Sequence, residues 1–120
     1  MTGKQAQNAA RWFQEAWNIE DWEFEVVIGE GAPSWAGVVE ATTLGTATWN
    51  RMRKWAGVWV SPAHCKKDGD NVLATLFHEM AHIVLEELKV KSGADSAHAV
   101  VERMAQVSVA AYQGKVKVPS

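Results

Sequence analysis

Hydrophobic positions near the N-terminus recur with the spacing of an α-helix. Between Thr2 or Gly3 and Asn18, they follow the three-, four-, seven- and eight-residue intervals that form the apolar stripe of an amphipathic helix. The residues of this stripe are Ala9, Trp12, Phe13, Ala16 and Trp17. Because one face of the helix is apolar, we expect it to pack on a sheet.

The pattern then changes to the alternation that is typical of β-strands. Between Trp22 and Ile28, apolar side chains alternate with residues 23, 25 and 27, and glycines follow at positions 29 and 31. Residues 36–42, 45–51 and 55–61 are also rich in β-branched and aromatic side chains and are separated by turn-like or charged breaks. The sequence therefore predicts a small, mainly antiparallel sheet, and we expect residues 55–61 to be its edge strand.

Two helices are predicted after the sheet. Pro62 and residues 66–69 indicate a loop, and the carboxylate of Asp70 is placed to cap the helix that follows. Apolar residues with helical spacing run from Leu73 to about Val90, and Gly93 ends this helix.

A last helix ends near Tyr112, and we expect residues 113–120 to form a loose tail. Its apolar positions are Val100, Val101, Met104, Val107 and Ala111. At 120 residues the chain has room for one compact domain, residues 1–120. The expected fold class is α+β, with an N-terminal backing helix, a small sheet and two C-terminal helices.

Composition excludes several classes of partner. A formal net charge of −2, with mostly scattered basic residues, provides no attraction to nucleic acid or to an anionic membrane. No apolar run approaches the roughly 18 residues that a membrane-spanning helix needs. The single cysteine, Cys65, excludes an internal disulfide and fits a reducing compartment, so we expect a cytoplasmic protein. The oligomeric state is left open.

Seven tryptophans, all in the first half of the chain, are the unusual feature of the composition. A small core gains much from large apolar rings, so we expect most of them in the core. Trp55 and Trp59 are the candidates for lining a substrate groove.

The segment His78-Glu79-Met80-Ala81-His82 carries the candidate chemistry. Residues four apart lie on one face of a helix, so both imidazoles can bind one metal ion. Zinc held by two histidines and a third protein ligand keeps a position for water and lowers the pKa of that water toward about 7. Glu79 then lies where a general base is needed. Two unrelated surface histidines are the alternative, but the apolar residues around them indicate a largely buried helix, where unpartnered histidines are costly.

The following helix offers two candidates for the third zinc ligand. His98 and Glu102 lie four residues apart, on one face of that helix, and spacing alone leaves both open. His64 and Cys65 form a further pair before the first helix. The Cys65 thiolate could cap the zinc in a latent form, although an ordinary loop pair is the simpler interpretation.

The motif and its distance from Glu102 resemble the gluzincin branch of zinc metallopeptidases, in which a glutamate ligand follows on a later helix. Twenty residues separate His82 from Glu102, as in thermolysin, and Ala105 matches the small residue of the family three positions after the ligand. The resemblance covers about residues 55–112, and the size of the chain is similar to minigluzincins and short phage-encoded zincin-like proteins. It implies a minimal zincin-like domain and Zn²⁺ bound by His78, His82 and Glu102, with His98 as the alternative third ligand.

The resemblance also has consequences around the metal. Thermolysin-like members carry an acidic residue that braces the first histidine, whereas this chain has Gln106, which can accept from the Nδ1–H of His78 only through its amide oxygen. In zincins the strand before the active-site helix pairs with an extended peptide, and this role falls to residues 55–61. The implied partner is a peptide or protein substrate, without nucleic acid or membrane.

The expected function is a zinc metalloendopeptidase that hydrolyses peptide bonds with Glu79 as general base. One alternative is a zinc-containing protein-binding or regulatory module, because a small chain has little surface for deep subsites. Another is a specialised protease similar to SprT-like or ImmA-like enzymes, since His98 after Gly93 resembles the third histidine of SprT-like proteases. The lack of a large basic patch, which binding to nucleic acid requires, counts against the SprT-like hypothesis.

Overall fold

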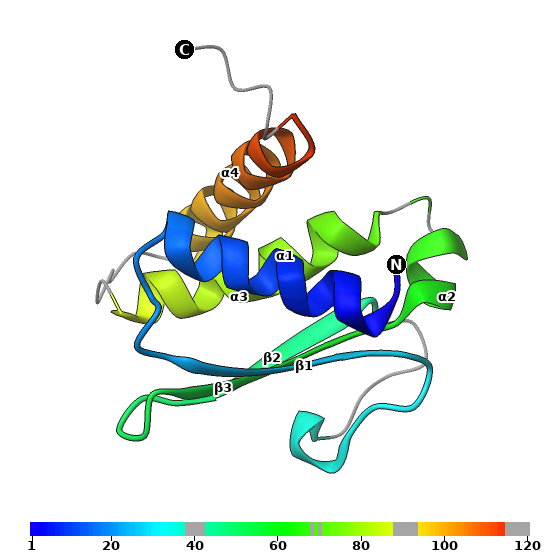
Figure 1. Ribbon diagram of the computed structural model, residues 1–120, viewed down its shortest axis with the longest axis horizontal. Helices are drawn as coiled ribbons and strands as arrows, with labels where there is room; N and C mark the ends of the chain where they lie inside the picture. The colour runs from blue at the N-terminus through cyan, green and yellow to red at the C-terminus, as the bar shows by residue number, and fades with distance from the viewer. Residues whose placement is uncertain (38–42, 68, 70, 88–93, 115–120) are drawn as a thin grey trace.

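An N-terminal helix, a small three-stranded mixed sheet and further helices follow one another along the chain, in an α+β arrangement (Figure 1). The computed structural model describes residues 1–37, 43–67, 69, 71–87 and 94–114, and only the backbone of residues 94–97. The elements in chain order are α1 (Gly3–Ala16), β1 (Glu23–Ile28), the 3₁₀ turn η1 (Ser34–Ala36), β2 (Gly45–Asn50), β3 (Trp55–Val60), α2 (Pro62–Lys67), α3 (Val72–Glu87) and α4 (Ala94–Gln113). Within the described ranges, no helix is long and apolar enough to cross a membrane.

Helices α1 and α3 cover one face of the sheet, and α4 packs on α3 on the side away from the sheet (Figure 1). The predicted N-terminal helix is confirmed, and Thr2 begins it with a capping box closed by Gln5. Phe13 of α1 and Phe77 of α3 are fully buried, with ring centroids 5.0 Å apart. Burial of each such side chain stabilises the fold by about 1.5–3 kcal/mol, so this contact anchors α3 to α1.

The strand order corrects two predictions. The order is β1-β3-β2, with β1 parallel and β2 antiparallel to β3, so the sheet is mixed and β3 is its central strand rather than an edge. The physical reason is that β3 is buried on both faces: Val58 faces the helices and Trp59, at 2% exposure, faces the other side. A continuous apolar run is typical of such a strand.

Smaller differences concern the loops. Ala36 belongs to η1 rather than to a strand, and residues 38–42 of the predicted strand 36–42 lie outside the described residues. The predicted loop after Pro62 contains the short helix α2. The side chain of Asn71 accepts from the backbone N–H groups of Leu73 and Ala74, so Asn71 caps α3; Asp70, the predicted cap, lies outside the described residues.

The predicted ends of the last two helices can be compared with the described ends of α3 and α4. Helix α3 is described to Glu87, so its predicted end near Val90 and Gly93 lies outside the described residues. Helix α4 extends to Gln113, one residue beyond the predicted end at Tyr112. Of the predicted tail, residues 115–120 lie outside the described residues.

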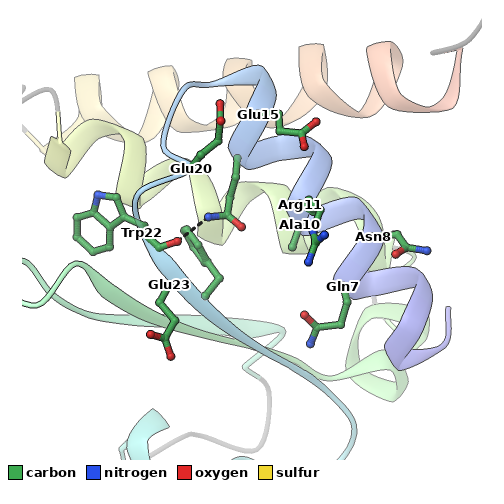
Figure 2. A pocket seen from close by; sticks show the side chains of 10 residues that line it. Gln7, Asn8, Ala10, Arg11, Glu15, Glu20, Trp22 and Glu23 are labelled. Carbon is green, nitrogen blue, oxygen red and sulfur yellow. Dashed lines mark hydrogen bonds between the residues drawn. The ribbon is translucent and has the colours of Figure 1, made fainter.

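The two edges of the sheet differ. The outer edge of β1 is covered by side chains of α1, because the Gln7 amide donates to the carbonyl of Val26 (3.1 Å) and the Gln14 amide to that of Trp22 (2.7 Å, dashed in Figure 2). On the other side of the sheet, the Ser61 N–H bonds to the Leu44 carbonyl, and alternation from this pair directs the polar backbone groups of residues 45, 47 and 49 outward. Within the described chain, β2 is thus the open edge.

The far face of the sheet is covered by Trp35 of η1. A Cβ atom on Gly57 would lie 2.7 Å from the Trp35 ring, which is held by Glu25 (Nε1 to Oε2, 2.5 Å) and by an edge contact with Trp55. Glycine at position 57 therefore allows the indole to lie flat on the strand.

Gly57→Ala should lower the free energy of unfolding by about 1–3 kcal/mol, because the new methyl group displaces this indole. Thermal unfolding followed by circular dichroism measures the change. Gly31→Ala is the matched control, since nothing lies within 4 Å of its added Cβ. Equal melting temperatures for the two variants would contradict the role assigned to Trp35.

Candidate metal centre and cleft

Helix α3 carries three of the predicted site residues on adjoining positions of one face. The rings of His78 and His82 lie with their centroids 5.3 Å apart and their planes 70° apart. The apolar residues of α3 that pack against the core, such as Phe77 and Met80, fix the rotation of the helix and so direct the two imidazoles toward α4. The four-residue spacing of the two histidines in the sequence therefore places their rings side by side in the structure.

Helix α4 brings both candidate third ligands to His78. Glu102 Oε1 lies 2.5 Å from His78 Nδ1, and the centroid of the His98 ring lies 5.5 Å from that of His78. The side chain of His78 is 20% exposed and that of Glu102 46% exposed, so the cluster opens to solvent on the α4 side. The structure therefore gathers His78, His82, Glu102 and His98 in one place and leaves the choice of third ligand open.

The hydrogen bond of His78 differs from the expectation for Gln106. The Nδ1 atom of His78 bonds to Glu102 rather than to the Gln106 amide, while Gln106 lines the same hollow of about 200 Å³ beside His78 and Glu79. A carboxylate is the stronger acceptor for an imidazole N–H, which explains the preference.

The environment of the site sets the charge of two groups. Burial raises the pKa of the Glu79 carboxyl to about 7. Burial, followed by the charges of His78 and His98, lowers the pKa of His82. A carboxyl with a pKa near neutrality can both accept and return a proton, and a neutral imidazole is the form that binds metals.

A cleft of about 380 Å³ separates α3 from the open strand β2. Glu79 and His82 form one side of it, and the other side consists of Thr43, Gly45, Thr46, Ala47 and Trp49. A Cβ atom on Gly45 would lie 2.9 Å from the Trp59 carbonyl oxygen and 3.5 Å from Glu79 Cγ, so glycine is required for this close approach. Sequence reasoning missed β2 as the wall of the site, and an isolated glycine at the start of a strand was the available signal.

The tryptophan expectation is wrong for both candidates. Trp59 is 2% exposed and donates its Nε1–H to the Gly29 carbonyl on the far face of the sheet, and Trp55 packs against Trp35 on that same face. Trp49 of β2 is the tryptophan that lines the cleft.

His64 and Cys65 do not approach the cluster of His78, His82, His98 and Glu102 as a pair. Cys65 is fully buried, with its Sγ 3.5 Å from the Thr75 hydroxyl, so the thiol does not reach solvent. His64 instead donates its Nδ1–H to the Thr43 carbonyl (2.9 Å), and Thr43 is part of the cleft wall. Helix α2 thereby holds the start of β2 in place.

His64→Ala should increase amide exchange at Thr46 and Ser61 about fivefold, because about 1 kcal/mol of hydrogen bonding to the segment that precedes β2 is lost. His64→Asn, whose side-chain amide can donate to the same carbonyl, should stay close to the wild type. Hydrogen exchange followed by NMR measures both. If the Asn variant exchanged as fast as the Ala variant, the hydrogen bond would not be what holds the strand.

The residues at the cluster can be tested against zinc. Two imidazoles on one tetrahedral zinc, with bonds of about 2.0–2.1 Å, place their ring centroids roughly 5.2 Å apart. The observed spacings of 5.3 Å and 5.5 Å match this value. Two donor atoms on one zinc lie roughly 3.3 Å apart, so the closer contact of His78 with Glu102 is a direct hydrogen bond, which metal binding by both atoms would displace.

The cluster still needs a side-chain rearrangement to close on one ion. Among the residues that the structure describes, no three His, Cys, Asp or Glu side chains are already gathered so as to hold a metal. The donor set therefore fits zinc in its chemistry and in its ring spacing, and rotation of side chains is required for the donor atoms to converge.

A second hollow, of about 450 Å³, lies between α1 and β1, away from this cluster (Figure 2). Arg11, Glu15, Glu20 and Glu23 give it mixed charge, and no histidine or cysteine lines it. Its two inward-reaching amides, Gln7 and Gln14, are already used to cover the edge of β1. The hydrogen bonds of these two amides therefore stabilise the fold.

Comparisons of this chain with protein-family models, with curated proteins and with solved structures found no match.

Proposed function

We propose that the chain is a zinc-dependent metallopeptidase whose centre is formed by His78, His82 and Glu102. The observation that carries the proposal is that α4 brings Glu102 to within 2.5 Å of His78, beside a cleft lined by Glu79 and His82. Glu102 is preferred to His98 as third ligand because its carboxylate contacts a nitrogen of His78 directly. The contact of His98 with His78 is between the two rings.

Zinc and Glu79 have different roles in the proposed reaction. When bound, zinc would supply a polarised water molecule of lowered pKa. Glu79, which lines the cleft from α3, would be the group that takes a proton from the attacking water and returns it to the leaving amine nitrogen. Its burial and its pKa near 7 suit both steps.

Substrate binding is assigned to β2 in place of the strand expected from the sequence. The outward N–H and C=O groups of Gly45, Ala47 and Trp49 form the open row to which an extended peptide can add as a further strand. Because residues 45 and 47 have small side chains, the peptide can approach Glu79 across them.

Incubation with unfolded casein and with a mixed peptide library tests the proposal. We expect cleavage by the zinc-loaded chain, no cleavage after treatment with a chelator, and recovery when zinc is restored. Cleavage that persists in the chelator, or no cleavage by a chain that binds zinc, would contradict the proposal.

A second candidate function is a zinc-containing protein-binding module. It is favoured by the donor atoms, which do not yet converge in the described residues, and by the small hollows of about 380 and 200 Å³ beside Glu79. A zinc-loaded chain that binds library peptides without cleaving them would support this function instead.

A further inference from the structure

Trp49 differs from the other six tryptophans. It is 38% exposed, whereas Trp22 and Trp59 are 2% exposed. Four indole N–H groups donate hydrogen bonds within the fold, those of Trp17, Trp22, Trp35 and Trp59. The indole N–H of Trp49, like those of Trp12 and Trp55, has no acceptor among the described residues, and the exposure of Trp49 leaves part of its ring open to solvent.

The position of Trp49 along the cleft follows from the way β2 lies beside α3. Gly45 lies against Glu79 at one end, and the Arg51–Glu86 ion pair (3.7 Å) joins the same two segments at the other. Side chains of residues 45, 47 and 49 point to the same face of the strand. Trp49 therefore lies two residues beyond Ala47 on the face that carries Glu79 and His82.

The side chains that β2 contributes to the cleft differ in size. Gly45 and Ala47 have small side chains, and Trp49 is the one large side chain that β2 contributes to the cleft. In a paired strand, the residue directly opposite lies about 4.5–5.5 Å away at Cβ and packs against its partner. An indole with a free face prefers an aromatic or large apolar partner.

We propose that Trp49 is a specificity-determining residue and that the chain selects extended peptides with an aromatic or large apolar side chain opposite Trp49. This inference rests on the proposed function. The selected side chain lies two residues along the substrate from the one opposite Ala47, where Glu79 and His82 border the cleft. The Nε1–H of Trp49, which has no acceptor among the described residues, can donate to a carbonyl oxygen of the same peptide.

The test compares peptides that differ by Phe or Ala at one position, scanned along a sequence that the wild type cleaves. We expect a Phe preference in kcat/KM of about tenfold, concentrated at one position. Trp49→Ala should reduce that ratio to near one, while Trp49→Phe should keep most of it. A ratio that Trp49→Ala leaves unchanged, or a wild type with no preference at any position, would overturn the inference.

Binding separates this inference from the proposed function. The same peptides, labelled with a fluorophore, are titrated with the zinc-loaded chain, and fluorescence anisotropy gives their affinities whether or not they are cleaved. If no peptide is cleaved, the proposed function fails, and the Phe-to-Ala affinity ratio in wild type and Trp49→Ala still decides the role of Trp49. Circular dichroism melting of each variant controls for folding, and Trp49→Phe provides a second variant if Trp49→Ala is unstable.

Discussion

Glu79→Gln should reduce peptide hydrolysis by a factor of about 100 to 10,000 and leave zinc affinity within a fewfold of the wild type. The amide cannot accept the proton that the general base must take, which accounts for the loss. Glutamine has nearly the same shape and carries no charge into the buried position beside Gly45, so the fold is retained. Steady-state kinetics on a cleaved peptide and metal analysis of the purified variant measure the two effects.

Glu86→Gln is the matched control for this variant. Glu86 lies on the same helix, near its end, and pairs with Arg51 at 3.7 Å. An ion pair so exposed contributes little, about 0–1 kcal/mol, so hydrolysis should remain at the wild-type level. Full activity of Glu79→Gln would show that another group takes the proton.

The second large effect concerns the metal ligands. His82→Ala should remove zinc binding almost completely, since one of two imidazoles on α3 is lost. Glu102→Ala should weaken zinc binding by more than about a hundredfold, which exceeds the roughly 10–100-fold effect of residues that only orient a ligand. His98→Ala should change the affinity by only a fewfold. Competition with a chromophoric chelator measures all three affinities.

The comparison of Glu102→Ala with His98→Ala decides the third ligand. If His98→Ala caused the larger loss, the site would consist of three histidines, and Glu102 would orient His78 through the observed Nδ1 contact. Equal and small losses in both variants would leave two histidines alone, which is too few protein ligands for a catalytic zinc site.

The helices and their chemistry could be predicted from the sequence because both depend on local spacing. The stripe around Phe13 predicts α1, and the four-residue interval between His78 and His82 places them on one face of α3. That Glu102 and His98 lie on one face of α4, toward His78, also agrees with their four-residue spacing. Choosing between them depends on side-chain positions that spacing does not specify.

The sheet order could not be predicted in the same way because it depends on contacts distant in the sequence. Residues 55–60 were expected at the edge, yet burial on both faces makes β3 central and moves the open edge to β2. The continuous apolar run of β3 was the signal against an edge. The cleft depends on Gly45 and Trp49 meeting α3 across the fold, and the isolated glycine at the start of β2 was the only local signal of this.

An anomalous-scattering map of a crystal of the zinc-loaded chain, recorded at the zinc absorption edge, tests the central claim most directly. We expect one strong peak between α3 and α4, within about 2.0–2.2 Å of donor atoms from His78, His82 and Glu102. A map without a peak at this cluster, or with zinc bound only elsewhere on the chain, would contradict it.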